Sequence, residues 1–87
     1  MMDANEVVLY PLMTESASLM VEKGNKLIFI VNPKSGKSDV KRAVEELYDV
    51  KVVRVTLQMT PRGEKKAFVK LDAAFKASDV AIKLGIL

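Results

Sequence analysis

The pattern of apolar residues along this chain predicts four strands, two of them short continuous apolar runs and two with apolar residues at every second position. Residues 7–9 form a short apolar strand, and residues 26–32, apolar on both faces, form a central strand covered by helices. Residues 51–59 alternate between apolar and polar side chains, as a half-exposed strand does. After a turn at residues 60–64, a second alternating stretch ends at Leu71, so these two strands form a hairpin.

A spacing of three and four residues predicts three helices. It is clearest in the second helix, whose inward face comprises Val40, Ala43, Val44 and Leu47. A hydroxyl residue stands at the N-cap position of each helix: Thr14, Ser38 and Ser78. The first helix covers residues 15–23, and glycines stop the first and last helices at Gly24 and Gly85.

The predicted order of elements is β-α-β-α-β-β-α. The helix between the second and third strands makes a crossover, and the hairpin closes the sheet. We therefore expect an α/β (α+β) sandwich, in which a four-stranded, mostly antiparallel sheet carries helices on its faces. A chain of 87 residues has room for one hydrophobic core, so residues 1–87 are expected to form a single domain.

Composition removes much chemistry from consideration. The chain has no cysteine and no histidine, which excludes disulfides, thiolate catalysis, zinc fingers and the imidazole base of hydrolase triads. No two carboxylates are spaced as a catalytic acid and base. We expect no enzyme activity, no metal and no cofactor. The longest apolar run, residues 27–31, is too short to cross a bilayer, and the N-terminus lacks the basic start of a signal peptide, so we expect a soluble cytoplasmic protein.

The tripeptide Gly36-Lys37-Ser38 stands between a strand and a helix, where a phosphate-binding loop would lie. That motif needs another glycine five residues before Gly36, where this chain has Val31. We therefore interpret Gly36 as a turn residue. Lys37 remains a candidate for phosphate contact, because a cation beside free N–H groups at a helix N-terminus can hold a phosphate, including that of an RNA backbone.

Residues 64–71 invite comparison with the strand of RNA-recognition domains that presents exposed aromatic rings to bases. Only Phe68 occupies an aromatic position, while Lys66 and Leu71 occupy the other two. With so few aromatic residues in the chain, a platform of stacked bases is not expected. The simpler interpretation of Phe68 is a residue packed under a helix.

The net charge of +3 is unevenly distributed. Most cations fall into two groups, one around the start of the second helix and one on the hairpin: Lys34, Lys37, Lys41 and Arg42, then Arg54, Arg62, Lys65, Lys66 and Lys70. Basic clusters with few aromatic residues favour contact with phosphates over reading of bases. A solvated surface without a partner explains the same charges, and both interpretations stay open at this point.

Six stretches taken together resemble a known family. In chain order they are residues 10–17, 25–31, 38–48, 50–55, 60–71, and 77–81 with Leu84-Gly85. Over about residues 6–87 the chain resembles the universal ribosomal protein twenty-three of the large subunit, in its archaeal form. The resemblance implies a structural component of that subunit which binds the third domain of large-subunit rRNA near the polypeptide exit tunnel. It also implies contact with neighbouring ribosomal proteins and a docking surface for nascent-chain factors such as the signal recognition particle, without membrane insertion.

The resemblance also assigns roles to particular side chains. The positions that match the family's RNA contacts are Lys34, Lys37, Lys41, Arg62, Lys65, Lys66 and Lys70. The position that matches factor docking is Glu15, which also complements the dipole of the first helix. Three places depart from the family, which commonly has arginine at Tyr10, lysine at Ser16 and an Asn-Thr pair at Thr56-Leu57.

Two other functions stand beside this one. The first is a free-standing α/β module that binds protein through the edge of its sheet. The second is a small enzyme similar to acylphosphatase, which needs an anion-binding arginine and a water-positioning asparagine in one loop. No loop of the sequence combines the two, so the interaction module is the stronger alternative.

Overall fold

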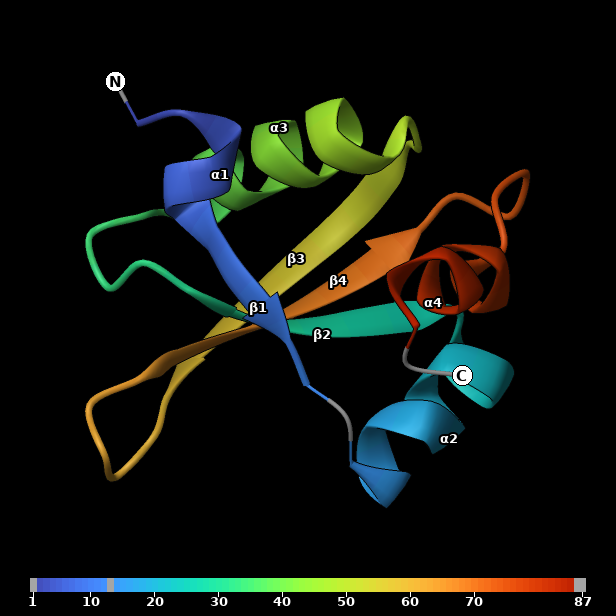
Figure 1. Cartoon of the computed structure of the whole chain (residues 1–87), viewed down its shortest axis with the longest axis horizontal. Helices are drawn as coiled ribbons and strands as arrows, with labels where there is room; N and C mark the ends of the chain where they lie inside the picture. Colours follow the sequence, from blue (N-terminus) through green and yellow to red (C-terminus); the bar gives the residue numbers. More distant parts are fainter. Residues whose placement is uncertain (1, 13, 86–87) are drawn as a thin grey trace.

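The computed structural model describes residues 2–12 and 14–85 (Figure 1). The elements are, in order, α1 (Ala4–Val7), β1 (Val8–Pro11), α2 (Glu15–Gly24), β2 (Lys26–Val31), α3 (Lys37–Tyr48), β3 (Val52–Met59), β4 (Lys65–Leu71) and α4 (Ala77–Leu84). The strands form one sheet in the order β1-β2-β4-β3, and every neighbouring pair is antiparallel. The predicted α+β fold and its order of strands and longer helices are confirmed.

The short helix α1 was not predicted. The sequence indicated a strand over residues 7–9, but residues 4–7 form one helical turn and the strand begins at Val8. The carbonyl of Asp3 accepts hydrogen bonds from the N–H groups of Glu6 (2.9 Å) and Val7 (3.1 Å). Val7 is fully buried, and α1 packs against α3. A single turn is too short to display a helical spacing of apolar residues, so pattern analysis missed it.

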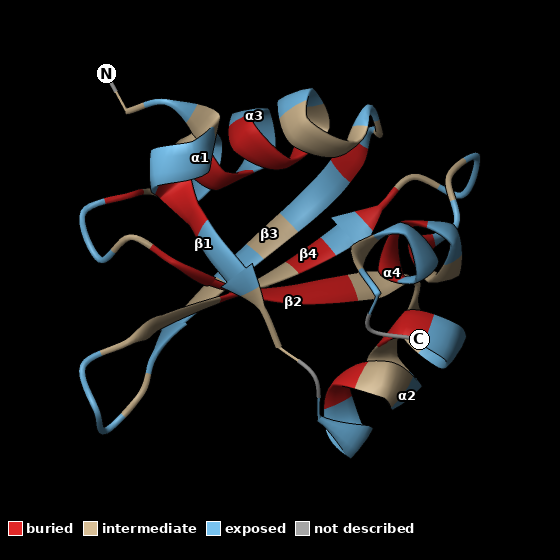
Figure 2. Ribbon diagram, viewed as in Figure 1, coloured by how far each residue is buried: buried red, intermediate tan, exposed pale blue. Residues whose placement is uncertain are grey.

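The main core lies on the face of the sheet that carries Leu27, Phe29 and Val31, which are buried (Figure 2). Helix α3 contributes to it through Val40, Ala43 and Val44, α1 and α4 also contribute, and α2, which lies beside β2 and against α4, reaches it through Val21. The predicted inward face of α3 is therefore confirmed, except that Leu47 is only partly buried. At the end of α3 the ring of Tyr48 stacks on Phe29, with centroids 5.6 Å apart and an interplanar angle of 8°.

The other face of the sheet is covered in part. In Figure 1, α2 lies on this side beside β2, whereas α1, α3 and α4 lie on the side of the main core. Ile28 and Ile30, which point away from that core, are buried as well. Over β3 and β4 the same face carries exposed or half-buried side chains: Arg54, Thr56, Gln58, Lys66, Phe68 and Lys70.

The ends of the helices confirm two of the predicted caps and correct three. Thr14 caps α2 as predicted, because its Oγ1 accepts the N–H of Ala17 (3.1 Å). At the other end Gly24 is still helical, and the left-handed residue that stops α2 is Asn25, with φ 53°. Gly85 stops α4 as predicted, with φ 77°.

Neither predicted serine is an N-cap. The helix α3 begins at Lys37, because the carboxylate of Asp39 reaches back to the N–H of Gly36 (2.9 Å) and places the cap there. The helix α4 begins at Ala77, whose N–H donates to the side chain of Asn25 (2.7 Å). In α4 the group that accepts the first helical N–H therefore comes from Asn25 and not from the predicted cap. Within the described residues no helix is long and apolar enough to cross a membrane.

Candidate nucleic-acid interface

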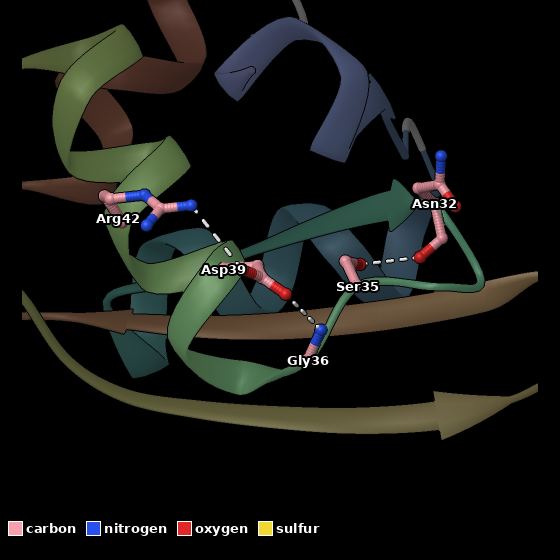
Figure 3. A network of polar contacts seen from close by, with 5 residues as sticks. All are labelled: Asn32, Ser35, Gly36, Asp39 and Arg42. Carbon is pink, nitrogen blue, oxygen red and sulfur yellow. Dashed lines mark hydrogen bonds and ion pairs between the residues drawn. The ribbon is translucent and has the colours of Figure 1, made fainter. Parts of the chain in front are cut away.

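The loop between β2 and α3 is held by its own polar groups (Figure 3). The carbonyl of Asn32 accepts from the N–H (2.9 Å) and the Oγ (2.6 Å) of Ser35. The side-chain Oδ1 of Asn32 accepts the N–H of Lys34 (2.9 Å). Ser35 is 1% exposed, whereas Lys34 is exposed. The loop therefore presents Lys34 to solvent from a fixed backbone.

The start of α3 is closed by a carboxylate. Asp39 accepts the N–H of Gly36 through Oδ2 and forms an ion pair with Arg42 through Oδ1 (3.5 Å), as Figure 3 shows. The N–H of Gly36 is thus not free for a phosphate, whereas Gly36 itself has no side chain to cap the N–H groups of the first turn, so phosphate contact at the start of α3 stays a prediction. Lys37 and Lys41 are exposed and belong to the first turns of the helix. They contribute as point charges on a fixed helix.

Lys65 joins the two groups of cations. Its Nζ donates to the carbonyl of Ser35 (2.8 Å), although the two residues are 30 positions apart. The turn end of the hairpin therefore lies against the loop that carries Lys34, and Lys65 itself is half-buried. This hydrogen bond gives Lys65 a positioning role, and because its ammonium group has two further donors, the RNA contact that the resemblance assigned to it stays a prediction.

Lys66 lies on the other face of the sheet, and Arg62 lies in the hairpin turn beside it. Together they line a hollow of about 330 Å³ between the hairpin turn and the start of α2, whose other lining residues are Leu12, Thr14, Ile30, Thr60, Pro61 and Glu64. Gly63, with φ 84°, allows the chain to reverse at this turn. The hydroxyl of Tyr10 donates to Glu64 Oε2 (2.6 Å) and so ties the turn to β1. This hydrogen bond raises the pKa of Tyr10 above its ordinary value.

Lys70 lies apart from these cations, in a second hollow of about 230 Å³ lined also by Lys26, Arg54, Thr56 and Phe68. Phe68 is half-buried and does not belong to the core cluster, so the prediction that it packs under a helix is not borne out by the main core and stays a prediction for the other face. The sequence analysis did not select Lys26. Its importance depends on the strand register that places it opposite Lys70, which no local pattern reveals.

Glu15 is exposed in the first turn of α2, directly after the cap residue Thr14. Thr14 lines the same hollow as Arg62 and Lys66, so Glu15, the first residue of α2, lies next to these two cations. Two of the departures from the family lie nearby or on the sheet: Ser16 is exposed in the same helical turn, and Leu57 is half-buried against the core. Leu57 thus faces the core, as the alternation of β3 predicts.

The functional groups of this surface are mainly lysines and arginines, held on a helix, a hydrogen-bonded loop and two strands. Among residues 2–12 and 14–85, the ion pair between Arg42 and Asp39 is the only one, so the other lysines and arginines there have no carboxylate partner. Across the same residues no group of three or more Asp, Glu, His or Cys is placed to hold a metal ion. Unpaired lysines and arginines on rigid elements suit a polyanion.

Comparison with known proteins agrees with these observations. The family model for Ribosomal protein L23 matches residues 6–83. A protein of Methanothermobacter thermautotrophicus called "Large ribosomal subunit protein uL23" is 47% identical over 85 residues, which are 98% of this chain and 99% of that protein. The protein of the same name from Methanococcus aeolicus is 44% identical over 85 residues, with the same coverage. The chain therefore belongs to the ribosomal protein L23 family.

Proposed function

We propose that this chain is a structural constituent of the large ribosomal subunit, located with that subunit in the cytoplasm, and that it binds large-subunit rRNA near the polypeptide exit tunnel. The names of its relatives support the ribosomal role. The observation that carries RNA binding is the hydrogen bond from Lys65 to Ser35, because it unites the basic loop and the basic hairpin. The proposed rRNA target is the third domain, and the proposal includes no catalytic step.

Binding is proposed to act mainly through backbone phosphates. The exposed or half-buried cations proposed for contact are Lys34, Lys37, Lys41, Arg62, Lys66 and Lys70, with Lys65 positioning the loop. Each phosphate neutralised releases counterions, which adds about 0.7 to 0.9 to the slope of log K against log salt. Six such contacts predict a slope of roughly −4 to −5.

The test combines assembly with salt dependence. The protein should sediment with large subunits at low salt, and its affinity for an rRNA fragment of the third domain should fall steeply as salt is raised. Lys34→Gln with Lys37→Gln should reduce the steepness by about two contacts. Lys83→Gln, which removes an exposed charge from α4, is the matched control and should leave the slope unchanged. A wild-type protein that stays away from large subunits would contradict the proposal.

We further propose that Glu15 helps dock nascent-chain factors, such as the signal recognition particle. A carboxylate repels phosphate, so an exposed Glu beside a basic surface is poorly placed for rRNA and well placed for a basic protein. Neighbouring large-subunit proteins are proposed as the remaining partners.

The alternative function, a free-standing protein-interaction module, has one observation in its favour. The strand β3 forms an edge of the sheet, and two apolar side chains on it, Val53 and Met59, are 52% and 54% exposed. An open edge with apolar side chains can pair with a strand of another protein. Recovery of the chain in protein complexes that lack rRNA would favour this alternative.

A further inference from the structure

The register of the sheet places three cations side by side on the face away from the main core. Lys26 of β2 is paired with Lys70 of β4, and Arg54 of β3 is paired with the same Lys70 from the other side. We call these three residues the cation row. Like charges that face each other across neighbouring strands destabilise a sheet by up to about 1 kcal/mol, unless an anion joins them. No ion pair links the cation row to a carboxylate among the described residues.

The next row of the same face holds an aromatic ring. Phe68 lies two residues from Lys70 on β4 and is paired with Ile28 of β2 and Thr56 of β3. Ile28 is buried, whereas Phe68 is half-buried and lies outside the core cluster. The cation row, Phe68 and Thr56 together line the hollow of about 230 Å³, and none of these five lining residues is acidic. A positive site with an aromatic ring matches the chemistry of single-stranded nucleic-acid binding.

The size of the hollow limits its occupant. Pockets for drug-sized ligands and cofactors measure about 300 to 1,000 Å³. The hollow falls below that range, so it suits one base or one phosphate better than a whole cofactor. The hydroxyl of Thr56 adds a group that both donates and accepts hydrogen bonds, as contacts to a base edge or a 2′-hydroxyl require.

We infer that this hollow binds one unpaired nucleotide of the rRNA, with its base against Phe68 and its flanking phosphates on the cation row. The inference rests on the proposed rRNA binding and adds to it a mode that the other cations do not provide. Lys34, Lys37 and Lys41 lie on a loop and a helix and contact phosphates, whereas this part of the sheet recognises a base that has left the RNA helix. The inference thus assigns a role in nucleotide binding to Lys26, Arg54, Thr56 and Phe68.

The test compares variants of the full chain in binding to an rRNA fragment that the wild-type protein binds. Phe68→Leu keeps an apolar side chain and removes the ring, so affinity should fall roughly 5- to 100-fold with an unchanged salt slope. Phe68→Tyr keeps the ring and should bind within a few-fold of wild type. Lys70→Gln should lower the slope by about one contact, whereas Lys83→Gln on α4 should not. Circular dichroism and thermal unfolding of each variant separate loss of contact from loss of fold.

A second measurement identifies what meets the ring. Photoreactive benzoylphenylalanine, placed at position 68 of the protein in assembled large subunits, should crosslink to one nucleotide of the rRNA. Crosslinks to protein alone would overturn the inference and make the hollow a contact for an acidic protein. If wild type binds the rRNA and Phe68→Leu binds equally well, the inference fails while the proposed function stands. If the wild-type protein itself does not bind rRNA, both fail.

Discussion

Asn25 stands where three segments of the backbone meet, and its replacement tests whether one side chain fixes an end of the sheet. Its Nδ2 donates to the carbonyls of Phe75 (2.9 Å) and Leu71 (3.2 Å), with a longer contact to Asp72 (3.4 Å). Its Oδ1 accepts the N–H of Ala77 (2.7 Å). Its backbone is left-handed, which asparagine tolerates better than most residues. The side chain therefore joins the end of α2 to the start of α4.

The expected cost follows from these contacts. The three shorter hydrogen bonds are worth about 0.5 to 1.5 kcal/mol each, so Asn25→Gly, which keeps the left-handed backbone without strain, should lose about 2 to 4 kcal/mol. Asn25→Ala should lose roughly 1 kcal/mol more, because alanine is strained in that conformation. Urea unfolding followed by circular dichroism measures both, with an unchanged m-value as the sign of an intact native state. Asn5→Ala, at an exposed position of α1, is the matched control.

A cost below about 0.5 kcal/mol for Asn25→Gly would refute the reasoning, because it would mean that water replaces these contacts without loss. The same experiment bears on the basic surface. The carbonyl of Asn25 accepts the N–H of Leu71 (3.1 Å), next to the paired Lys26 and Lys70. Variants that loosen this end of the sheet should therefore also weaken the binding of rRNA, and a variant with full stability should not.

Three further predictions concern the core, the tyrosines and the first helix. Phe29→Ala should lower the free energy of unfolding by about 3 to 5 kcal/mol, and Leu47→Ala by clearly less, because Leu47 is only partly buried; urea unfolding distinguishes them. A hydrogen bond raises the pKa of Tyr10, and burial raises the pKa of Tyr48, so in ultraviolet titration both should ionise above pH 10.0. The stability that the two neutral tyrosines contribute should be fully present below pH 10.0 and should be lost as pH rises through their raised pKa values. Glu15→Ala should weaken the binding of a basic docking factor to ribosomes, leave occupancy in large subunits unchanged, and cost only about 0.3 to 1 kcal/mol of stability.

Local chemistry predicted much of this fold. The helical spacing in α3 and the alternation of Val55 and Leu57 in β3 follow from which side chains meet the core, so the sequence contains them directly. The ends of β3 correct the prediction: a register shift buries Val52, and Val53 and Met59, which alternation placed on the core side, are exposed. The cap of α2 at Thr14 is equally local. The prediction of Ser38 as the N-cap of α3 was wrong, because Ser38 and Asp39 are both polar residues that can define the start of this helix. Asp39 reaches the N–H of Gly36, and its carboxylate places the cap there instead of at Ser38.

Contacts between distant segments explain what the sequence did not predict. The lysines were recognised as a basic surface, but their division into separate roles depends on strand register. Lys65 turns to the carbonyl of Ser35, and Lys26 meets Lys70 across the sheet. Phe68 shows the same limit: alternation places it opposite the core, yet whether a helix covers that face is decided by where α2 packs. Pattern analysis assigns a side chain to a face and leaves its neighbours undetermined.

Two adjacent lysines allow positioning to be separated from binding. Lys65 and Lys66 follow each other on β4 and point to opposite faces, and Lys65 donates to the carbonyl of Ser35 whereas Lys66 lines the hollow beside Arg62. Lys65→Met keeps most of the side-chain stem but removes a charged hydrogen bond, so it should cost about 1 to 2 kcal/mol in urea unfolding.

The same change at Lys66 removes only a charge that faces solvent, so stability should shift by less than about 0.5 kcal/mol. Binding to the rRNA fragment should show the reverse pattern. Lys66→Met should lower the salt slope by about one contact, and Lys65→Met should lower affinity with little change in slope, because the loop that carries Lys34 loses its support. Equal unfolding midpoints for the two variants would mean that Lys65 does not hold the loop, and the two groups of cations would then have to bind rRNA independently.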